Sequence, residues 1–532
     1  MSLFSLSFAI FLAVVFIAYF GFPKKYRHYQ WVILLVASYA FYIFAGARPT
    51  VVFFLLASTV STWFGALKLG QVNARYKQQL KTCPPEEKKA LKRASAKKKR
   101  RILTLIAVVN FGILAVVKYS NFFVENVNVL LVRASASPLP VVRFLLPLGI
   151  SFYTFQSIGY VIDVSRGKTE PDKNLLRYAL FVSYFPQIIQ GPISRHSDLA
   201  HQLYEPHAFD YHRMTFGMQR ALWGYFKKLV IADRVALLTD TVFNHYMNYE
   251  GITVFLAALL YGVQVYADFS GGMDIISGIS EALGIDLIEN FKRPFFAKSV
   301  AEFWQRWHIT LGAWMREYVF YPLAMSKPFS KMAKRLRGPF GPTVAKILPT
   351  SLASFIVFLI VGIWHGAAWR YVAYGIYQAV FVSSATLFEP FYAKCRARFK
   401  IDTERFIWKV FQALRTLFVV TVGRCIGHAL SLSAAFHMLK SAFTKFNFWV
   451  LFDGSLFNLG LDRANFRLML VTILFLFIVD AVQERGVHIR TKISQQSLPV
   501  RWAIYYLGIF AIIIFGTYGP GYDASSFIYQ GF

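Results

Sequence analysis

The sequence predicts an all-α, polytopic membrane protein, and three observations lead to this fold class. Of the 532 residues, 56% are hydrophobic and only 16% are charged, whereas about a quarter of an ordinary soluble domain is charged. The apolar residues form runs as long as membrane-spanning helices require. The Lys and Arg residues gather between these runs, as in cytoplasmic loops. We expect about eleven transmembrane helices in one integral-membrane domain covering residues 1–532.

The formal net charge of +31 has two readings. Nucleic acid binding is one, but the gathering of Lys and Arg beside apolar runs favours membrane orientation and anionic headgroups instead. We therefore expect the lipid bilayer and no nucleic acid as a partner. A second use stays open, because basic cytoplasmic loops can also attract coenzyme A or an acidic carrier protein.

The N-terminal part, residues 1–145, is expected to hold several spans. Lys24, Lys25 and Arg27 follow the first apolar run, which is the reverse of the charge order in a signal peptide, so we predict a retained span with its N-terminus outside. A hydrophilic loop over residues 71–101 carries twelve Lys or Arg residues and is predicted to be cytoplasmic. Residues 121–140 are expected outside. The predicted spans are residues 2–22, 31–46, 50–69 and 102–118.

The central part, residues 146–388, carries the motifs. A span over residues 144–164 contains Tyr153 and Gln156 and has too many polar residues to face lipid. Residues 184–193 hold Gln187, two prolines and a glycine, which break a regular helix. We read a re-entrant element here, with a surface loop as the alternative.

The segment that follows is expected to lie at the membrane surface before the chain enters again. Residues 211–235 mix apolar residues with Lys227 and Lys228 and read as an interfacial amphipathic helix. Residues 252–267 form the next span, which Asp268 to Asp274 are expected to end. Four histidines stand in a polar stretch, and we read them as exposed loop residues, since metal sites have tighter spacing; they are His196, His201, His207 and His212.

Residues 303–369 organise the chain, because each half places one histidine beside tryptophans. On a continuous helix, Trp304, His308 and Met315 share one face. A histidine inside a membrane is costly without a partner or a task, so it is a functional hypothesis, although a satisfied core histidine is the simpler reading. A basic loop over residues 327–346 follows. The next span begins at residue 350 and rises about 22 Å, which carries His365 beyond the midplane.

The C-terminal part, residues 389–532, is expected to be scaffold. We predict that the basic loops over residues 394–409 and 485–501 are cytoplasmic, like those over 71–101 and 327–346. The tail from residue 519 is expected outside. The predicted spans here are residues 410–432, 468–482 and 503–515, after the span 371–388 that ends the central part.

Motifs of soluble enzymes give no alternative chemistry. The chain has no phosphate-binding Walker loop, no G-x-S-x-G elbow and no dinucleotide fingerprint. The three cysteines, Cys83, Cys395 and Cys425, are too far apart in sequence for a metal motif. We expect no metal and no permanently bound cofactor.

Four motifs in order resemble the membrane-bound O-acyltransferase family, and most of all its alginate O-acetyltransferase membrane-subunit branch, which is related to the D-alanyl transfer protein of teichoic acid synthesis. They lie at residues 146–156, 184–192, 303–318 and 364–366, and the tail at 527–529 also resembles that branch. The resemblance implies a ring of helices, including re-entrant and interfacial ones, around a thin central tunnel.

The resemblance also implies the site. His365 matches the catalytic histidine of the family and His308 its second signature residue. The donor is a thioester, either acetyl-CoA or an acyl carrier protein, and the acceptor is an extracytoplasmic polysaccharide. The implied partners are an extracytoplasmic SGNH-hydrolase-like protein and a cytoplasmic carrier protein. The residues expected to line the tunnel or the substrate are Trp304, Trp307, Arg306, Trp364, Gln156, Tyr153, Gln187 and Arg316.

Three functions therefore stay open at this stage. The first is an O-acyltransferase of the cell membrane that passes an acetyl group outward, and D-alanyl transfer to teichoic acid is its variant. The second is a proton-coupled transporter or flippase, in which the histidines relay protons; we find no internal repeat to support it. The third is a membrane scaffold without chemistry, which the paired histidine motifs disfavour.

Overall fold

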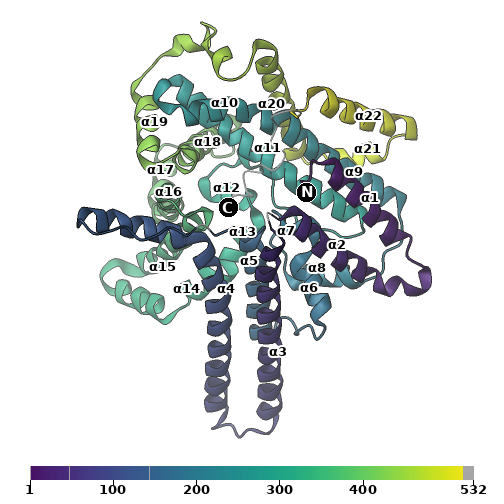
Figure 1. The fold of residues 1–532 in the computed structure, drawn as a ribbon. Coiled ribbons are helices and arrows are strands. Elements are labelled where there is room, and N and C mark those ends of the chain that lie inside the picture. Colours follow the sequence, from purple (N-terminus) through teal and green to yellow (C-terminus); the bar gives the residue numbers. More distant parts are fainter. Residues whose placement is uncertain (1, 47, 143, 519–532) are drawn as a thin grey trace. The chain divides into compact units, whose positions relative to one another are not determined.

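The computed structural model describes residues 2–46, 48–142 and 144–518 (Figure 1). In this part of the chain the regular secondary structure is helical, and the only β pairing is an isolated bridge between Phe291 and Trp307. Eight of the described helices are long and apolar enough to cross a bilayer, or nine if one pair bent by 59° forms a single span. The all-α, polytopic membrane class is thereby confirmed.

The helix count differs from the expected eleven because two of the expected spans are short. The helix in the first apolar run has 15 residues and the one after residue 149 has 17, whereas a span takes about 20. Within the described residues the chain divides into two compact units, residues 2–221 with 276–288 and residues 222–275 with 289–518.

The first unit contains nine helices in whole or in part, and also the end of α11, whose other part belongs to the second unit. They are α1 (Leu6–Phe20), α2 (Gln30–Ala45), α3 (Val52–Thr82), α4 (Lys88–Arg133), α5 (Ile150–Arg166), α6 (Leu175–Ser183), α7 (Phe185–Ile188), α8 (His196–Tyr204), α9 (Tyr211–Tyr225) and α11 (Ile252–Ala282).

The basic segment 71–101 is a helical hairpin, and the prediction of a loop was wrong. Helices α3 and α4 pack against each other and are joined by a short turn at residues 83–87 (Figure 1). With 31 and 46 residues, they are about 46 and 69 Å long, well beyond the roughly 30 Å of a bilayer core. The basic residues do not break the helices because Lys and Arg are good helix formers. Residues 121–133, expected as an extracellular segment, also continue α4.

The polar span and the broken segment after it are both buried in the first unit. Nearly every residue of α5 is buried, as expected of a span too polar for lipid. Helix α7 is four residues long, with Pro186 in its first turn, and all four residues are buried. Gly149, at φ 67°, precedes α5 against the carbonyl oxygen of Ile188. A Cβ atom at this position would collide with that oxygen, so the approach requires glycine.

The four histidines near residue 200 lie partly on helices. His201 and His212 are exposed as expected, but His196 is mostly buried, with its side chain 12% exposed. Its ring packs on Tyr160 at 4.6 Å between centroids, and its Nε2 lies 3.8 Å from Asp172. The prediction of exposure was therefore wrong for His196 and for the half-buried His207, and the prediction of a loop was wrong for the three that lie on α8 and α9. Among the described residues, no group of three potential ligands that could hold a metal ion is found, and the three cysteines are free thiols.

The second unit contains the remaining helices. They are α10 (Asp233–Asn244), α12 (Val300–Arg306), α13 (Ile309–Met315), α14 (Tyr321–Ala324), α15 (Lys327–His365), α16 (Trp369–Leu387), α17 (Glu389–Arg398), α18 (Phe406–His428), α19 (Leu432–Thr444), α20 (Arg463–Glu484), α21 (Ile489–Ser494) and α22 (Leu498–Phe515).

Two lysines expected at the membrane surface are instead buried in the second unit. Lys228 lies 2.8 Å from the carboxylate of Asp233 and 2.6 Å from that of Asp268, while Lys227 lies 2.7 Å from that of Asp274. The lysines are buried because these acids neutralise them, and the interfacial position of the segment stays a prediction. Asp268 and Asp274 lie inside the continuous helix α11 rather than ending a span, and Asp233 begins α10.

The basic segment 327–346 is likewise helical rather than a loop. It forms the first half of α15, and the non-helical conformation of Gly341 kinks the helix there. Later in α15, Gly362 meets Gly375 of α16 so closely that an added Cβ would lie 2.5 Å from the Gly375 Cα atom. This glycine pair lets the two helices touch three residues before His365.

Replacing Gly362 with Ala is expected to destabilise the protein by about 1–3 kcal/mol, because the added methyl group meets backbone atoms that have no room to move. The measurement is the midpoint of thermal unfolding in detergent. The matched control is Gly112→Ala in α4, where an added Cβ meets no atom within 4 Å. An unchanged midpoint for Gly362→Ala would show that the contact between α15 and α16 is looser than described.

Candidate active site

His308 lies at a break between two short helices, not on one helical face as predicted. Ser299 caps α12 by accepting a hydrogen bond from the backbone N–H of Glu302, and α12 ends at Arg306. His308 then takes a left-handed conformation, with φ 46° and ψ 54°, and α13 begins at the next residue. Such a conformation is uncommon for a residue other than glycine and needs support from its surroundings.

Asn290 supplies part of this support and determines the tautomer of His308. Its Oδ1 accepts hydrogen bonds from the backbone N–H of Thr310 at 3.0 Å and from the Thr310 hydroxyl at 3.0 Å, and it lies 3.2 Å from Nδ1 of His308. Because a backbone N–H can only donate, this amide atom is the oxygen, and Nδ1 of His308 must carry a proton. In the neutral imidazole, Nε2 then holds the lone pair.

Both histidines pack near one tryptophan. The Trp364 ring is 6.1 Å from that of His308 and 5.0 Å from that of His365, between centroids. Both imidazoles are buried. Tyr371 and Tyr374 complete the surroundings of His365, at 6.5 and 5.6 Å. The predicted pair of histidines is therefore brought into one cluster within the second unit.

Burial also sets the charge of His308, which lies between α12 and α13 and outside the candidate spans. Loss of hydration, together with the proximity of His365, lowers the pKa of its imidazole to about 3. A desolvated imidazole favours its neutral form. His308 is thus neutral at ordinary pH and can accept a proton or a hydrogen bond at Nε2.

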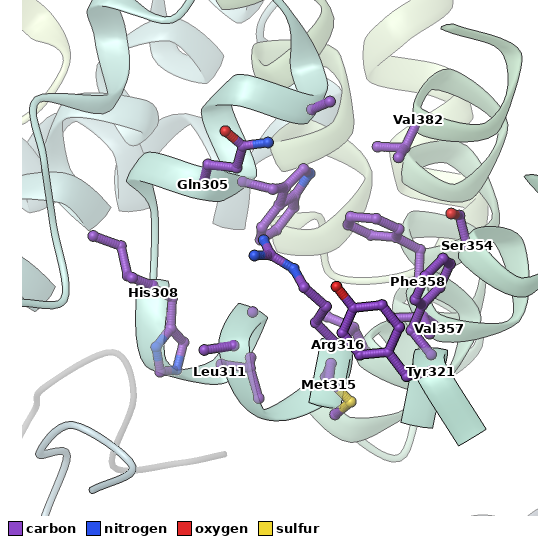
Figure 2. A pocket seen from close by; sticks show the side chains of 17 residues that line it. Gln305, His308, Leu311, Met315, Arg316, Tyr321, Ser354, Val357, Phe358 and Val382 are labelled. Carbon is purple, nitrogen blue, oxygen red and sulfur yellow. The ribbon is translucent and has the colours of Figure 1, made fainter. Parts of the chain in front are cut away.

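A pocket of about 680 Å³ opens beside His308 (Figure 2). In the view of Figure 2, His308 lies at one side, and Arg316 extends toward the middle near Tyr321. The walls come mainly from α12, α13, the π-helical turn Arg316–Phe320 and the second half of α15. Val361 is the last α15 residue in the lining, one turn before His365. The pocket is mainly apolar with a few polar groups, as is common for ligand sites.

The predicted residues of this region divide into two groups. Trp304 and Arg316 line the pocket, and the indole N–H of Trp304 donates to Gln378 at 3.2 Å. Trp307 instead packs in the core, stacked on Phe303 at 5.6 Å. Arg306 is also not in the lining; its guanidinium lies 2.8 Å from each of two carboxylates, those of Glu302 and Glu484.

The other three predicted residues lie in the first unit. Gln187 donates from Nε2 to Oε1 of Gln156 at 2.6 Å, and Gln156 donates to the carbonyl oxygen of Phe181 at 2.8 Å. The Ser194 hydroxyl donates to Gln187 at 2.9 Å. Tyr153 is 2% exposed. These residues form a buried polar cluster, and their role as tunnel lining stays a prediction.

Comparison with known proteins decides the family. The model of the MBOAT, membrane-bound O-acyltransferase family, matches residues 166–336 and 339–426. The probable alginate O-acetylase AlgI of Azotobacter vinelandii is 32% identical over 478 residues, which cover 89% of this chain and 82% of that protein. This chain belongs to the membrane-bound O-acyltransferase family.

Two further relatives show the breadth of this family. The peptidoglycan O-acetyltransferase of Helicobacter pylori is 31% identical over 408 residues, covering 70% of this chain and 68% of that protein. The teichoic acid D-alanyltransferase of Bacillus subtilis is 30% identical over 257 residues, covering 46% and 60%. The chain is an acyltransferase and a multi-pass membrane protein, and the side on which each basic segment lies stays a prediction.

Several residues of the acyltransferase site were missed from the sequence. Asn290 had no signal, since it is 18 residues from His308 and polar loops are common. Arg424 had a signal in the sequence, because a charged residue inside a predicted span usually has a partner or a function within the membrane. Its guanidinium lies over three aromatic rings, with Trp307 the nearest at 4.6 Å, and Gly262 leaves the space that it occupies.

Replacing Asn290 with Leu is expected to slow acyl transfer by about ten- to a hundredfold, because buried donors left without an acceptor cost about 1–3 kcal/mol each and His308 loses its tautomer preference. The measurement is transfer of a labelled acyl group by the purified protein. Asn290→Asp keeps an acceptor and is expected to retain more activity. Equal losses in the two variants would contradict the assigned hydrogen bond.

Proposed function

We propose that this acyltransferase passes an acetyl group from a cytoplasmic thioester across the membrane for O-acylation of an extracytoplasmic polysaccharide, with His365 as the catalytic residue and His308 assisting. The observation that carries the proposal is the buried cluster of His308, Trp364 and His365, whose first member also lines the pocket. A donor in the pocket would thus lie next to one imidazole, with the second imidazole one tryptophan away.

The donor side of the proposal rests on the chemistry of the pocket. Arg316 is exposed and cationic and lies in the lining, so it is suited to the phosphate groups carried by acetyl-CoA or by the prosthetic arm of a carrier protein. Apolar residues such as Val357 and Phe358 form the wall on α15, which suits an uncharged acyl thioester. A volume of about 680 Å³ lies within the range of ligand pockets.

The reaction requires a neutral imidazole next to the acceptor hydroxyl. The hydroxyl oxygen attacks the acyl carbonyl carbon, the C–S bond breaks, and the proton of the hydroxyl passes by way of the imidazole to the leaving thiolate. His365 serves this step either as the general base or as a transient acyl carrier that is acylated first and then attacked by the hydroxyl. His308, held with Nε2 unprotonated, orients the thioester or accepts the proton.

The acceptor side is inferred from the relatives. A protein named for alginate O-acetylation aligns with 89% of this chain, whereas a teichoic acid D-alanyltransferase aligns with 46%. This difference favours acetyl transfer to a cell-envelope polysaccharide over D-alanyl transfer. An extracytoplasmic SGNH-hydrolase-like protein is the proposed acceptor of the exported group, because this chain has no hydrolase motif of its own.

Replacing His365 with Ala is expected to lower acyl transfer by about 10²–10⁴-fold, the usual contribution of a general acid–base residue, and His308→Ala to lower it less. The measurement is transfer of the labelled acetyl group from acetyl-CoA by the protein in lipid vesicles. The control is His437→Ala, an exposed histidine of the same unit. All three variants are expected to unfold at the wild-type temperature.

The same assay separates the alternatives. Acid quenching followed by peptide mass spectrometry would find an acetylated His365 if it is a carrier, and an unmodified one if it is a base. Activity with a D-alanyl carrier thioester but not with acetyl-CoA would replace the acetyl proposal. Full activity of His365→Ala would remove the catalytic assignment.

A further inference from the structure

The left-handed turn at His308 is held by a short pairing of two chain segments. Residues 290–293 and 306–309 run antiparallel, bridged at Phe291 and Trp307. The N–H of Lys292 donates to the carbonyl oxygen of Arg306 at 2.9 Å, and the N–H of Ile309 donates to that of Asn290 at 3.0 Å. We call these two segments the paired segments. Asn290, the hydrogen-bond partner of His308, is part of this pairing.

Strained backbone lies at both ends of the pairing. Arg293 and His308 each have φ near 46° and lie in the left-handed region. Conformations of this kind persist only where neighbouring interactions determine them, and they gather at functional sites. The two backbone hydrogen bonds of this bridge are few for this purpose, so a further constraint on the paired segments is to be expected.

Glu484, the last residue of α20, supplies that constraint. Its Oε2 accepts from Nε of Arg293 at 2.6 Å, and its Oε1 accepts from Nη1 of Arg306 at 2.8 Å. One carboxylate therefore joins an arginine of each paired segment. The same Nη1 of Arg306 lies 3.5 and 3.4 Å from the carbonyl oxygens of Lys292 and Arg293, which extends the contact across the pairing.

The helix that carries Glu484 is itself anchored to the surroundings of His308. One turn earlier on α20, the carboxylate of Asp480 accepts from the hydroxyl of Tyr266 at 2.8 Å. The Tyr266 ring packs near Trp307 at 6.3 Å and near Phe291 at 6.1 Å, the two bridged residues. Helix α20 thus contacts the paired segments directly through Glu484 and indirectly through the bond of Asp480 to Tyr266 of α11.

We propose that Glu484 is a positioning residue for His308: by joining Arg293 and Arg306 across the paired segments, it holds the left-handed turn that presents the imidazole to the pocket. The inference rests on the proposed role of His308 in acyl transfer. Glu484 itself does not line the pocket and touches no reacting group, so it acts on the rate by way of His308. A displacement of about 1 Å in a reacting group can cost a hundredfold in rate.

The first measurement needs no activity. Hydrogen–deuterium exchange of the full-length protein in detergent reports the protection of the amides of Lys292 and Ile309. For Glu484→Gln, which keeps the shape of the side chain and removes its charge, exchange in peptides covering residues 289–293 and 306–310 is expected to rise at least tenfold. The control is Glu389→Gln, which removes another carboxylate paired with an arginine in the same unit and is expected to leave these peptides unchanged.

The second measurement is acyl transfer by the same proteins. Glu484→Gln is expected to lower kcat about tenfold or more while KM for the thioester changes by less than twofold, and Glu484→Asp is expected to recover part of the loss. In a His308→Ala background, Glu484→Gln should have no further effect. A merely structural role would lower the unfolding temperature and would lower the residual rate of His308→Ala as well.

The outcomes separate the two proposals. Unchanged exchange in Glu484→Gln overturns the positioning role while leaving acyl transfer intact. Faster exchange with unchanged kcat also overturns it, because the pairing would then not govern His308. If the wild-type protein transfers no acyl group from any thioester tested, the proposed function fails, and exchange alone then decides whether Glu484 holds the turn.

Discussion

The hydrogen bonds that Asn290 makes to the turn after Trp307 are the interaction on which the site depends. A histidine in a left-handed conformation is unfavourable on its own, and it is retained because Oδ1 of Asn290 accepts from both donors of Thr310 while lying against Nδ1 of His308. The same contacts leave Nε2 as the basic atom. Backbone strain, tautomer and the direction of the imidazole therefore have one common cause.

The second histidine lies at the end of a closely packed helix pair. Helices α15 and α16 touch at Gly362 and Gly375, and α15 ends at His365. Small residues at a contact let helix backbones approach within a membrane, where apolar burial alone gives no preference between protein and lipid. The Trp364 ring then packs near both imidazoles. In this acyltransferase a closely packed helix pair thus holds His365, and a strained turn holds His308.

The buried lysines and glutamines described above follow one rule in both units. Where lysines are buried in the second unit, carboxylates lie within 2.8 Å, and where glutamines are buried in the first unit, they bond to one another and to the backbone. A polar group removed from water keeps a partner because the loss of hydration otherwise exceeds what packing returns. This rule explains why a chain with so many Lys and Arg residues can still place several of them away from water.

The sequence by itself determined the class of the protein. Long apolar runs separated by basic stretches can be satisfied only by membrane helices, since lipid offers no partner to an open backbone, and the two histidine motifs pointed to the cluster that the structure contains. The tertiary structure alone decided where helices end. We predicted loops for the stretches 71–101 and 327–346 because charged residues indicate exposure to water. Charged residues with high helix propensity can, however, extend a helix beyond the membrane. It also decided which residues act with His308, since Asn290 and Glu484 lie 18 and 176 positions away in the chain, and only the pairing of distant segments brings them to the turn.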